Sequence, residues 1–172
     1  KLPIIMYHSV LKGRKYQGRY VISPADFEND VLYLKKKGYT TVVMDDLIKY
    51  VNQKGTLPKK PVMLTFDDGY YNNYLYIYPI AKKYNVKVVI SPIGACSDQY
   101  TQNEKDANHA IYSHCTWNQI REMINSGLVE FQNHSYNLHQ CKKGKRLGAG
   151  KLYNESSEKY KMMLYEDLFK MQ

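Results

Sequence analysis

The sequence predicts an α/β fold, in which the strands of a parallel sheet alternate with helices. Short apolar runs alternate with segments of helical periodicity, and the runs themselves show no polar–apolar alternation. At 172 residues the chain is long enough for one domain with a real core and too short for two ordinary domains. Hydrophobic residues make up 44% and charged residues 24%, a balance typical of a globular rather than a disordered protein.

Five short apolar runs are predicted to be strands. Several are rich in Val and Ile, as expected for strands that are buried on both faces of a parallel sheet. They lie at residues 3–7, 40–44, 61–66, 86–92 and 128–132.

The first helix is predicted to begin after Ser23, which is a favourable N-cap residue. Phe27, Val31 and Leu34 recur on one face and are expected to be buried. Gly38 follows a run of lysines and is a typical helix stop.

A second helix is predicted after Thr116, which forms a capping-box pattern with Gln119, and it should end at Gly127. Its buried face is expected to carry Ile120, Met123 and Ile124. Further helices are expected at about residues 45–52, 72–84 and 157–171. The polar stretch at 94–115 is predicted to be a long loop.

Repeated strand–helix units favour right-handed crossovers and therefore a sheet or a barrel. Five strands are too few to close a β/α barrel, and the chain stops at the end of a helix. We therefore expect residues 1–172 to form a single domain that lacks its C-terminal strands.

Composition excludes several classes of protein. The net charge is +9, but the lysines are scattered and no nucleic-acid-binding motif accompanies them, so nucleic acid is not an expected partner. No apolar run approaches the roughly 20 residues that span a bilayer. A leader or membrane anchor upstream of Lys1 stays compatible with the sequence. Cys96, Cys115 and Cys141 lack paired spacing and are expected to be free thiols.

Three predicted strands are followed by ionisable residues: His8, the pair Asp67 and Asp68, and His134 with His139. In β/α folds the carboxyl ends of strands converge on one site. One carboxylate and two imidazoles can hold a metal ion with a position open for water, while a second carboxylate serves as a base. Taken singly, each feature also fits a turn, a buried histidine or a loop histidine, and only their combination favours a reaction centre.

Two motifs resemble the polysaccharide deacetylase (NodB homology) family, carbohydrate esterase family 4. Thr-Phe-Asp-Asp-Gly at residues 65–69 matches the first motif of the family, and His-Ser-Tyr-Asn-Leu-His at 134–139 matches the second. The resemblance covers almost the whole chain and implies a distorted (β/α) barrel. In the family, a strand with an Arg/Tyr-Pro-Tyr-like motif would be expected after Gln172.

The resemblance also implies roles for the site residues. Asp67 would be the general base, and Asp68, His134 and His139 would bind one divalent metal ion, with Zn²⁺ favoured over Co²⁺, Ni²⁺ or Fe²⁺. The His–His interval is one residue longer than in the commonest version of the motif. Together with Ile-Met-Tyr-His-Ser at residues 5–9, this resembles the branch that deacetylates poly-N-acetylglucosamine, in which His8 would be the catalytic acid.

The implied activity is removal of N-acetyl groups from a GlcNAc-containing polysaccharide, with release of acetate, outside the cell or at its surface. Three alternatives stay open: the same chemistry on peptidoglycan, chitin oligomers or acetylated xylan; a non-catalytic saccharide-binding barrel; and a purely structural metal site. No substrate-binding residues are assigned, and His109 and His114 receive no role.

Overall fold

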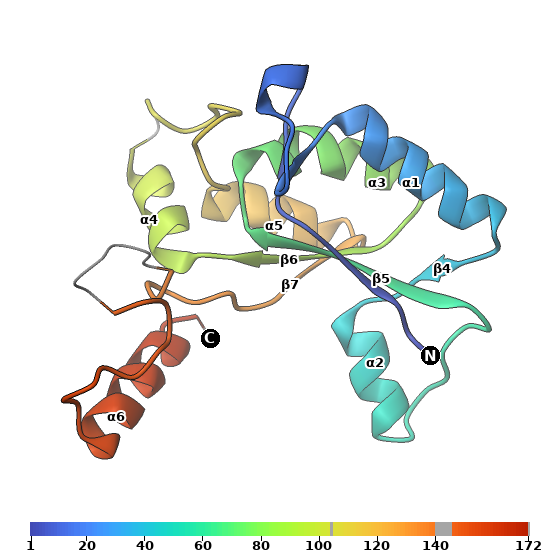
Figure 1. Ribbon diagram of the computed structural model, residues 1–172. Coiled ribbons are helices and arrows are strands. Elements are labelled where there is room, and N and C mark those ends of the chain that lie inside the picture. Colours follow the sequence, from blue (N-terminus) through green and yellow to red (C-terminus); the bar gives the residue numbers. More distant parts are fainter. Residues whose placement is uncertain (104, 140–145, 172) are drawn as a thin grey trace.

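In the computed structural model, which describes residues 1–103, 105–139 and 146–171, a parallel sheet forms the centre of the molecule (Figure 1). The strand order is β1-β5-β6-β7, and β4 pairs with the start of β5. The strands are β1 (Ile4–Tyr7), β4 (Thr40–Thr41), β5 (Pro61–Asp68), β6 (Val88–Pro92) and β7 (Val129–Phe131). All of these pairings are parallel, which confirms the predicted α/β class. The described strands form an open sheet.

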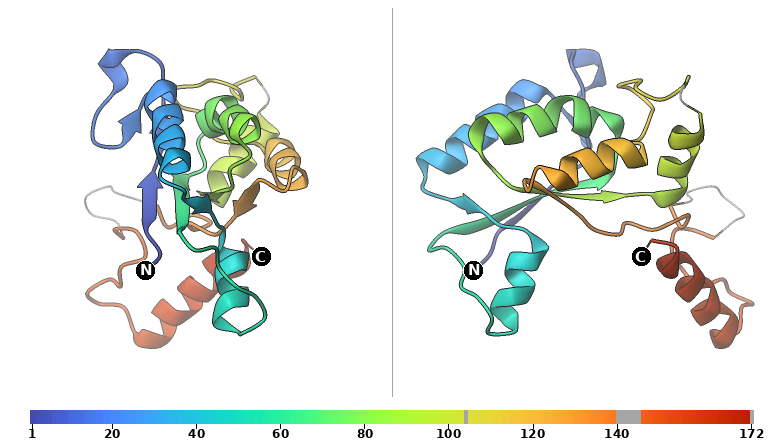
Figure 2. Two further views of the ribbon diagram at one scale, coloured as in Figure 1. Left: turned by 90° about the vertical axis from the view of Figure 1, so that its right-hand side faces the viewer. Right: turned by 180° about the vertical axis from the view of Figure 1, so that it is seen from behind.

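Three helices cover one face of this sheet, as Figures 1 and 2 show. They are α1 (Pro24–Lys36), α3 (Tyr78–Tyr84) and α5 (Trp117–Asn125). A π-helical turn, η2 (Asn73–Ile77), leads into α3. On the opposite side lie α2 (Met44–Val51) and α6 (Ser157–Phe169), while α4 (Gly94–Gln102) follows β6. None of the helices in the described ranges is both long and apolar enough to cross a membrane.

The main core lies between the sheet and the three covering helices. Tyr7 of β1, Phe27 of α1 and Phe66 of β5 form an aromatic cluster, with ring centroids 5.1 to 5.4 Å apart. Phe27 and Phe66 are fully buried. Because buried aromatic side chains contribute heavily to core stability, this cluster fixes β1 and β5 to each other just before their carboxyl ends.

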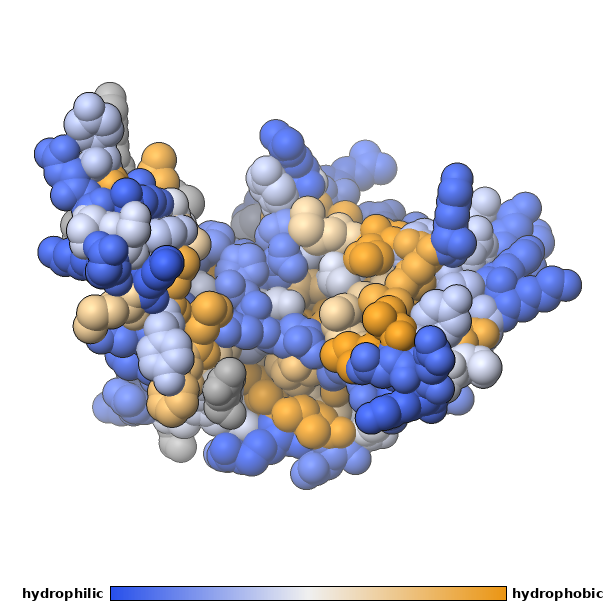
Figure 3. Space-filling view, turned by 90° about the horizontal axis from the view of Figure 1, so that it is seen from below, coloured by the Kyte–Doolittle hydropathy of each residue, from blue (hydrophilic) through white to orange (hydrophobic). Residues whose placement is uncertain are grey.

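The opposite face of the sheet is less completely covered. A smaller cluster of Val42, Val43, Met63 and Val89 packs against residues of α2. On β1, however, Ile4 and Met6 are 58% and 59% exposed. Figure 3 shows apolar surface, in orange, among hydrophilic regions on this side.

The predicted N-cap at Ser23 and the predicted capping box at Thr116 are confirmed, and Ser23 also forms a capping box, with Asp26. Both depend on residues only three positions apart. The Ser23 hydroxyl accepts a hydrogen bond from the Asp26 N–H, and Thr116 accepts one from the Gln119 N–H. Phe27, Val31 and Leu34 are buried as expected.

Several predicted boundaries were wrong. The strand expected at 40–44 ends at Thr41, since Met44 already begins α2, where the Asp46 carboxylate accepts a hydrogen bond from the Val43 N–H at 3.1 Å. Residues 94–102 form α4 instead of a loop, because Ser97 and Tyr100 are buried against neighbouring elements despite the polar sequence. Ile124, expected in the core, is 48% exposed.

A small second sheet was not predicted. It pairs β2 (Ser9–Val10) with β3 (Val21–Ile22), with the 3₁₀ turn η1 (Arg14–Tyr16) between them. Strands of two residues are too short to produce a recognisable pattern in a sequence. The pair lies directly after His8 and forms one side of the site.

Candidate metal and catalytic site

The carboxyl end of β5 carries both aspartates of the site. The backbone turns sharply there, because Asp68 and Gly69 both have φ of +69°. Aspartate tolerates this left-handed conformation better than most residues. A Cβ on Gly69 would lie 2.6 Å from the Pro92 Cβ, so only glycine fits beside β6. The turn brings Asp68 close to His134 and His139, which lie in the loop that follows β7.

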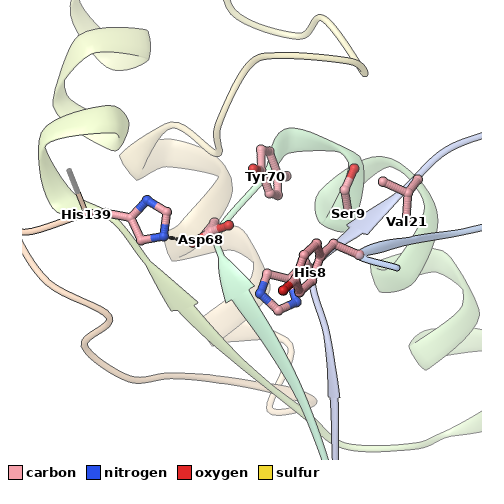
Figure 4. Close-up of a pocket in the computed structure, with 7 residues that line it drawn as sticks. His8, Ser9, Val21, Asp68, Tyr70 and His139 are labelled. Carbon is pink, nitrogen blue, oxygen red and sulfur yellow. Dashed lines mark ion pairs between the residues drawn. The ribbon is translucent and has the colours of Figure 1, made fainter. Parts of the chain in front are cut away.

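Asp68, His134 and His139 come together in a compact cluster. The Asp68 Oδ1 lies 3.5 Å from the His134 Nε2 and 3.6 Å from the His139 Nε2. One possible ligand atom from each residue lies within 4.8 Å of the other two. The close-up in Figure 4 shows His139 directed at Asp68.

The donor set of this cluster fits a divalent metal ion. The Asp68 side chain is only 6% exposed, and among the described residues its Oδ1 has no hydrogen-bond partner. A buried carboxylate oxygen without a partner is costly unless a cation or donor reaches it. One carboxylate oxygen and two imidazole nitrogens are ligands that Zn²⁺ and related ions accept.

His8 and Asp67 form a second pair beside this cluster. The His8 Nε2 lies 3.8 Å from the Asp67 Oδ2, and the two side chains are 19% and 22% exposed. His8 follows β1, and β1 pairs with β5 up to Tyr7 opposite Phe66, so the sheet itself brings the pair together. The His8 ring also lies 5.0 Å from the ring of Tyr20.

A cavity of about 380 Å³ joins the pair to the metal cluster. Figure 4 shows His8 and Ser9 on one side of it and Asp68 and His139 on the other. The residues that line it are His8, Ser9, Tyr20, Val21, Asp68, Tyr70 and His139. All five predicted site residues are therefore near one another, and the roles given to them remain predictions.

Buried asparagines, which sequence reasoning missed, hold the His8 segment in place. The Asn73 side-chain amide donates to the His8 carbonyl at 2.9 Å, and Asn72 accepts from the Val10 N–H and donates to the Ser9 hydroxyl. Both asparagines are fully buried at the start of η2. Their position soon after the Asp-Asp-Gly turn is the one sequence signal that could have identified them.

Two aromatic residues beside Asp68 were also missed. Burial, and then the nearby charge of Asp68, raise the pKa of the Tyr70 hydroxyl to about 12, so that it is a neutral hydrogen-bond donor at neutral pH. His114 stacks on Tyr70 at 4.8 Å and on Tyr100 at 5.8 Å between ring centroids. Burial lowers the pKa of His114 to about 4. No local pattern in the sequence connects His114 to β5.

The two cysteines in the described residues take no part in the cluster. Cys96 and Cys115 are free thiols, as expected, and burial raises the pKa of Cys115 to about 12. Cys141 lies outside the described residues.

Comparison with known proteins gives consistent results for sequence and structure. Residues 54–167 match the family model described as polysaccharide deacetylase. The chain is 33% identical over 135 residues to the putative polysaccharide deacetylase YxkH of Bacillus subtilis. The aligned region covers 78% of this chain and 42% of YxkH. It is 28% identical over 146 residues to the poly-β-1,6-N-acetyl-D-glucosamine N-deacetylase of Staphylococcus epidermidis, covering 85% and 48% of the two chains. The match thus spans less than half the length of either curated relative.

Among solved structures, the chain is similar to a de-N-acetylase from Aggregatibacter actinomycetemcomitans. The TM-score is 0.80 at 35% sequence identity, and the match covers 96% of this chain and 70% of that one.

Proposed function

The chain belongs to the polysaccharide deacetylase family, and from this premise we propose that it is part of a metal-dependent hydrolase that removes N-acetyl groups from a GlcNAc-containing polysaccharide. The observation that supports the proposal is that His8, which is paired with Asp67, lines the same cavity as Asp68 and His139. A saccharide-binding module would need no such pair beside a metal cluster.

We propose that Asp68, His134 and His139 hold one divalent metal ion, with Zn²⁺ the first candidate and Co²⁺, Ni²⁺ or Fe²⁺ as alternatives. When bound, an ion of this kind polarises a carbonyl group and makes water a better nucleophile at neutral pH. The partly exposed His139 side chain, at 46%, leaves the cluster open toward the cavity, as a catalytic site requires.

In the proposed reaction, Asp67 accepts a proton from the attacking water as the oxygen of that water bonds to the acetyl carbon. His8 then donates a proton to the amide nitrogen as the carbon–nitrogen bond breaks. Acetate and a free amine on the sugar are the products. The two roles suit these side chains because they lie together at the ends of the neighbouring strands β1 and β5, and each is about one-fifth exposed.

For the substrate, we propose a poly-N-acetylglucosamine exopolysaccharide, in keeping with the name of the relative from S. epidermidis. A polymer of this kind lies outside the membrane, so we place the enzyme outside the cell or at its surface. Peptidoglycan, chitin oligomers and acetylated xylan are the competing substrates.

The test is acetate release from β-1,6-linked N-acetylglucosamine oligomers, compared with chitin oligomers, peptidoglycan fragments and acetylated xylan. The assay is run with metal-loaded and chelator-treated protein, both on this chain and on a form extended beyond Gln172. We expect metal-dependent acetate release that is highest with the β-1,6-linked oligomers. Saccharide binding with no acetate release in either form would refute the enzyme proposal, and release from another polymer alone would correct the substrate.

A further inference from the structure

The loop between the two metal-ligand candidates is held by a carboxylate from a distant helix. Asp167 of α6 accepts two backbone hydrogen bonds from this loop, from the Tyr136 N–H at 2.9 Å and from the Asn137 N–H at 2.7 Å. Each bond uses a different oxygen of the carboxylate. The two N–H groups lie in the short segment that separates His134 from His139.

Asp167 is unusual for the helix on which it lies. It is 7% exposed and is the buried residue of α6, whereas large apolar side chains of the same helix face solvent. These are Met162, Tyr165, Leu168 and Phe169, each at least 50% exposed. Burial of a carboxylate costs free energy that its hydrogen bonds must offset, so the two bonds to the loop account for its buried position. Lys170, at the end of α6, adds a second contact with the loop, 4.7 Å above the centre of the Tyr136 ring.

The other side of the loop is held by the start of α4. The Gly94 N–H donates to the Ser135 carbonyl at 3.0 Å, and the Ala95 N–H donates to the Tyr136 carbonyl at 2.8 Å. A Cβ on Gly94 would lie 2.8 Å from the Tyr136 ring and would overlap the Met171 sulfur, so glycine allows α4, α6 and the loop to meet.

The loop also closes on itself and on β6. The Leu138 N–H donates to the Ser135 hydroxyl at 3.2 Å, and the His134 N–H donates to the Pro92 carbonyl at 3.4 Å. Tyr136 and Asn137 lie between His134 and Leu138 in the sequence, and Asp167 accepts hydrogen bonds from their N–H groups. Without Asp167, these two neighbouring N–H groups would lose their partner, and the turn between the histidines would lose its main restraint.

We propose that Asp167 is a positioning residue that shapes the loop of residues 134–139 so that both imidazoles point at Asp68. The proposal rests on the metal site of the proposed function. Residues that orient metal ligands through hydrogen bonds change metal affinity when they are removed, even though they do not touch the ion.

The test is Asp167→Asn, which keeps one acceptor oxygen but presents an amide N–H₂ to the second loop N–H. We expect the affinity for Zn²⁺ or Co²⁺, measured by titration calorimetry, to fall by about 10- to 100-fold. In the metal-free protein, hydrogen exchange at the Tyr136 and Asn137 amides should become faster. The visible absorption spectrum of the Co²⁺ form should also change, since the ligand geometry is disturbed.

Glu155→Gln is the matched control. Glu155 is another buried carboxylate, with 9% residue exposure, but it pairs with Arg146 and accepts from the Leu152 N–H instead of the loop. Its loss should lower the melting temperature and leave metal affinity and exchange at residues 136 and 137 unchanged. The proposal is overturned if Asp167→Asn lowers stability but binds metal as tightly as the wild type.

Wild-type measurements separate this proposal from the proposed function and guard against a variant that does not fold. Slow exchange at Tyr136 and Asn137 in the metal-free wild type supports the restraint by Asp167, and exchange at the rate of an unprotected loop refutes it. Metal binding without acetate release would refute the deacetylase proposal and leave the positioning role intact. Failure of the wild type to bind metal would overturn both.

Discussion

The two halves of the site are held by different parts of the fold. Asp68, His134 and His139 form a compact group around a carboxylate that is 6% exposed, and the histidine loop is fixed by α4 and α6. His8 and Asp67 lie 3.8 Å apart at the ends of the paired strands β1 and β5, and the buried Asn73 side chain donates to the His8 carbonyl. These supports are compatible with the proposed roles, in which the first half binds a metal ion and the second exchanges protons with a substrate.

The division starts within a single pair of neighbouring residues. Asp68 has a φ of +69° and leaves the extended conformation of β5, so its side chain and that of Asp67 face different surroundings. Asp68 turns into the buried cluster, and Asp67 faces His8. This separation is the physical basis for giving the two carboxylates different roles.

The largest effect is expected from Asp68→Asn, which changes the carboxylate proposed to bind the metal ion. We expect metal affinity to fall by at least about 100-fold and activity to be lost, since the single carboxylate ligand disappears. Asparagine tolerates the positive φ at this position, so the fold should persist. Metal content and circular dichroism measure the two effects. Normal metal content in this variant would refute the ligand assignment.

Asp67→Asn changes the proposed general base and should lower turnover without changing metal binding. We expect turnover to fall by about 10²- to 10⁴-fold, the usual contribution of a general base, with metal affinity unchanged. The comparison uses acetate release at saturating metal together with calorimetric titration. A near-normal rate would mean that another group accepts the proton.

His8→Gln is expected to have a smaller effect, of about 10²-fold on turnover, at the lower end of the range for acid–base groups. Because the His8 side chain is 19% exposed, water can partly replace it as a proton donor. Acetate release at saturating metal, compared between the wild type and the variant, measures the effect. A near-normal rate in the variant would exclude His8 as the acid.

The smallest effect is expected at His114, which stacks on Tyr70 beside Asp68. Its folded-state pKa of about 4 lies below the ordinary value of 6.5, so the unfolded chain binds more protons between these two pH values. The free energy of unfolding of the metal-free protein should therefore fall as the pH is lowered from about 6.5 to about 4. His114→Phe should retain the stacking and reduce this pH dependence. The free energy of unfolding is measured by urea denaturation at several pH values, and an equal pH dependence in the wild type and the variant would contradict the expectation.

The sequence alone was sufficient for features that depend on near neighbours or on strong motifs. The N-cap at Ser23, the capping box at Thr116, the apolar strands and the membership in the family were all predicted and are confirmed. The grouping of Asp67, Asp68 and the histidines was also anticipated, because parallel strands bring their carboxyl ends to one edge of a sheet.

Only the tertiary structure revealed the supports of the site. The polar sequence of α4 carries no helical pattern, and its start is placed by contacts with the loop after β7. Asp167, Asn73 and His114 contact Tyr136, His8 and Tyr70, which lie in or beside the site and are far away in the sequence. Local propensity and periodicity report on residues within a few positions of each other, whereas these contacts exist only once the sheet has brought distant segments together.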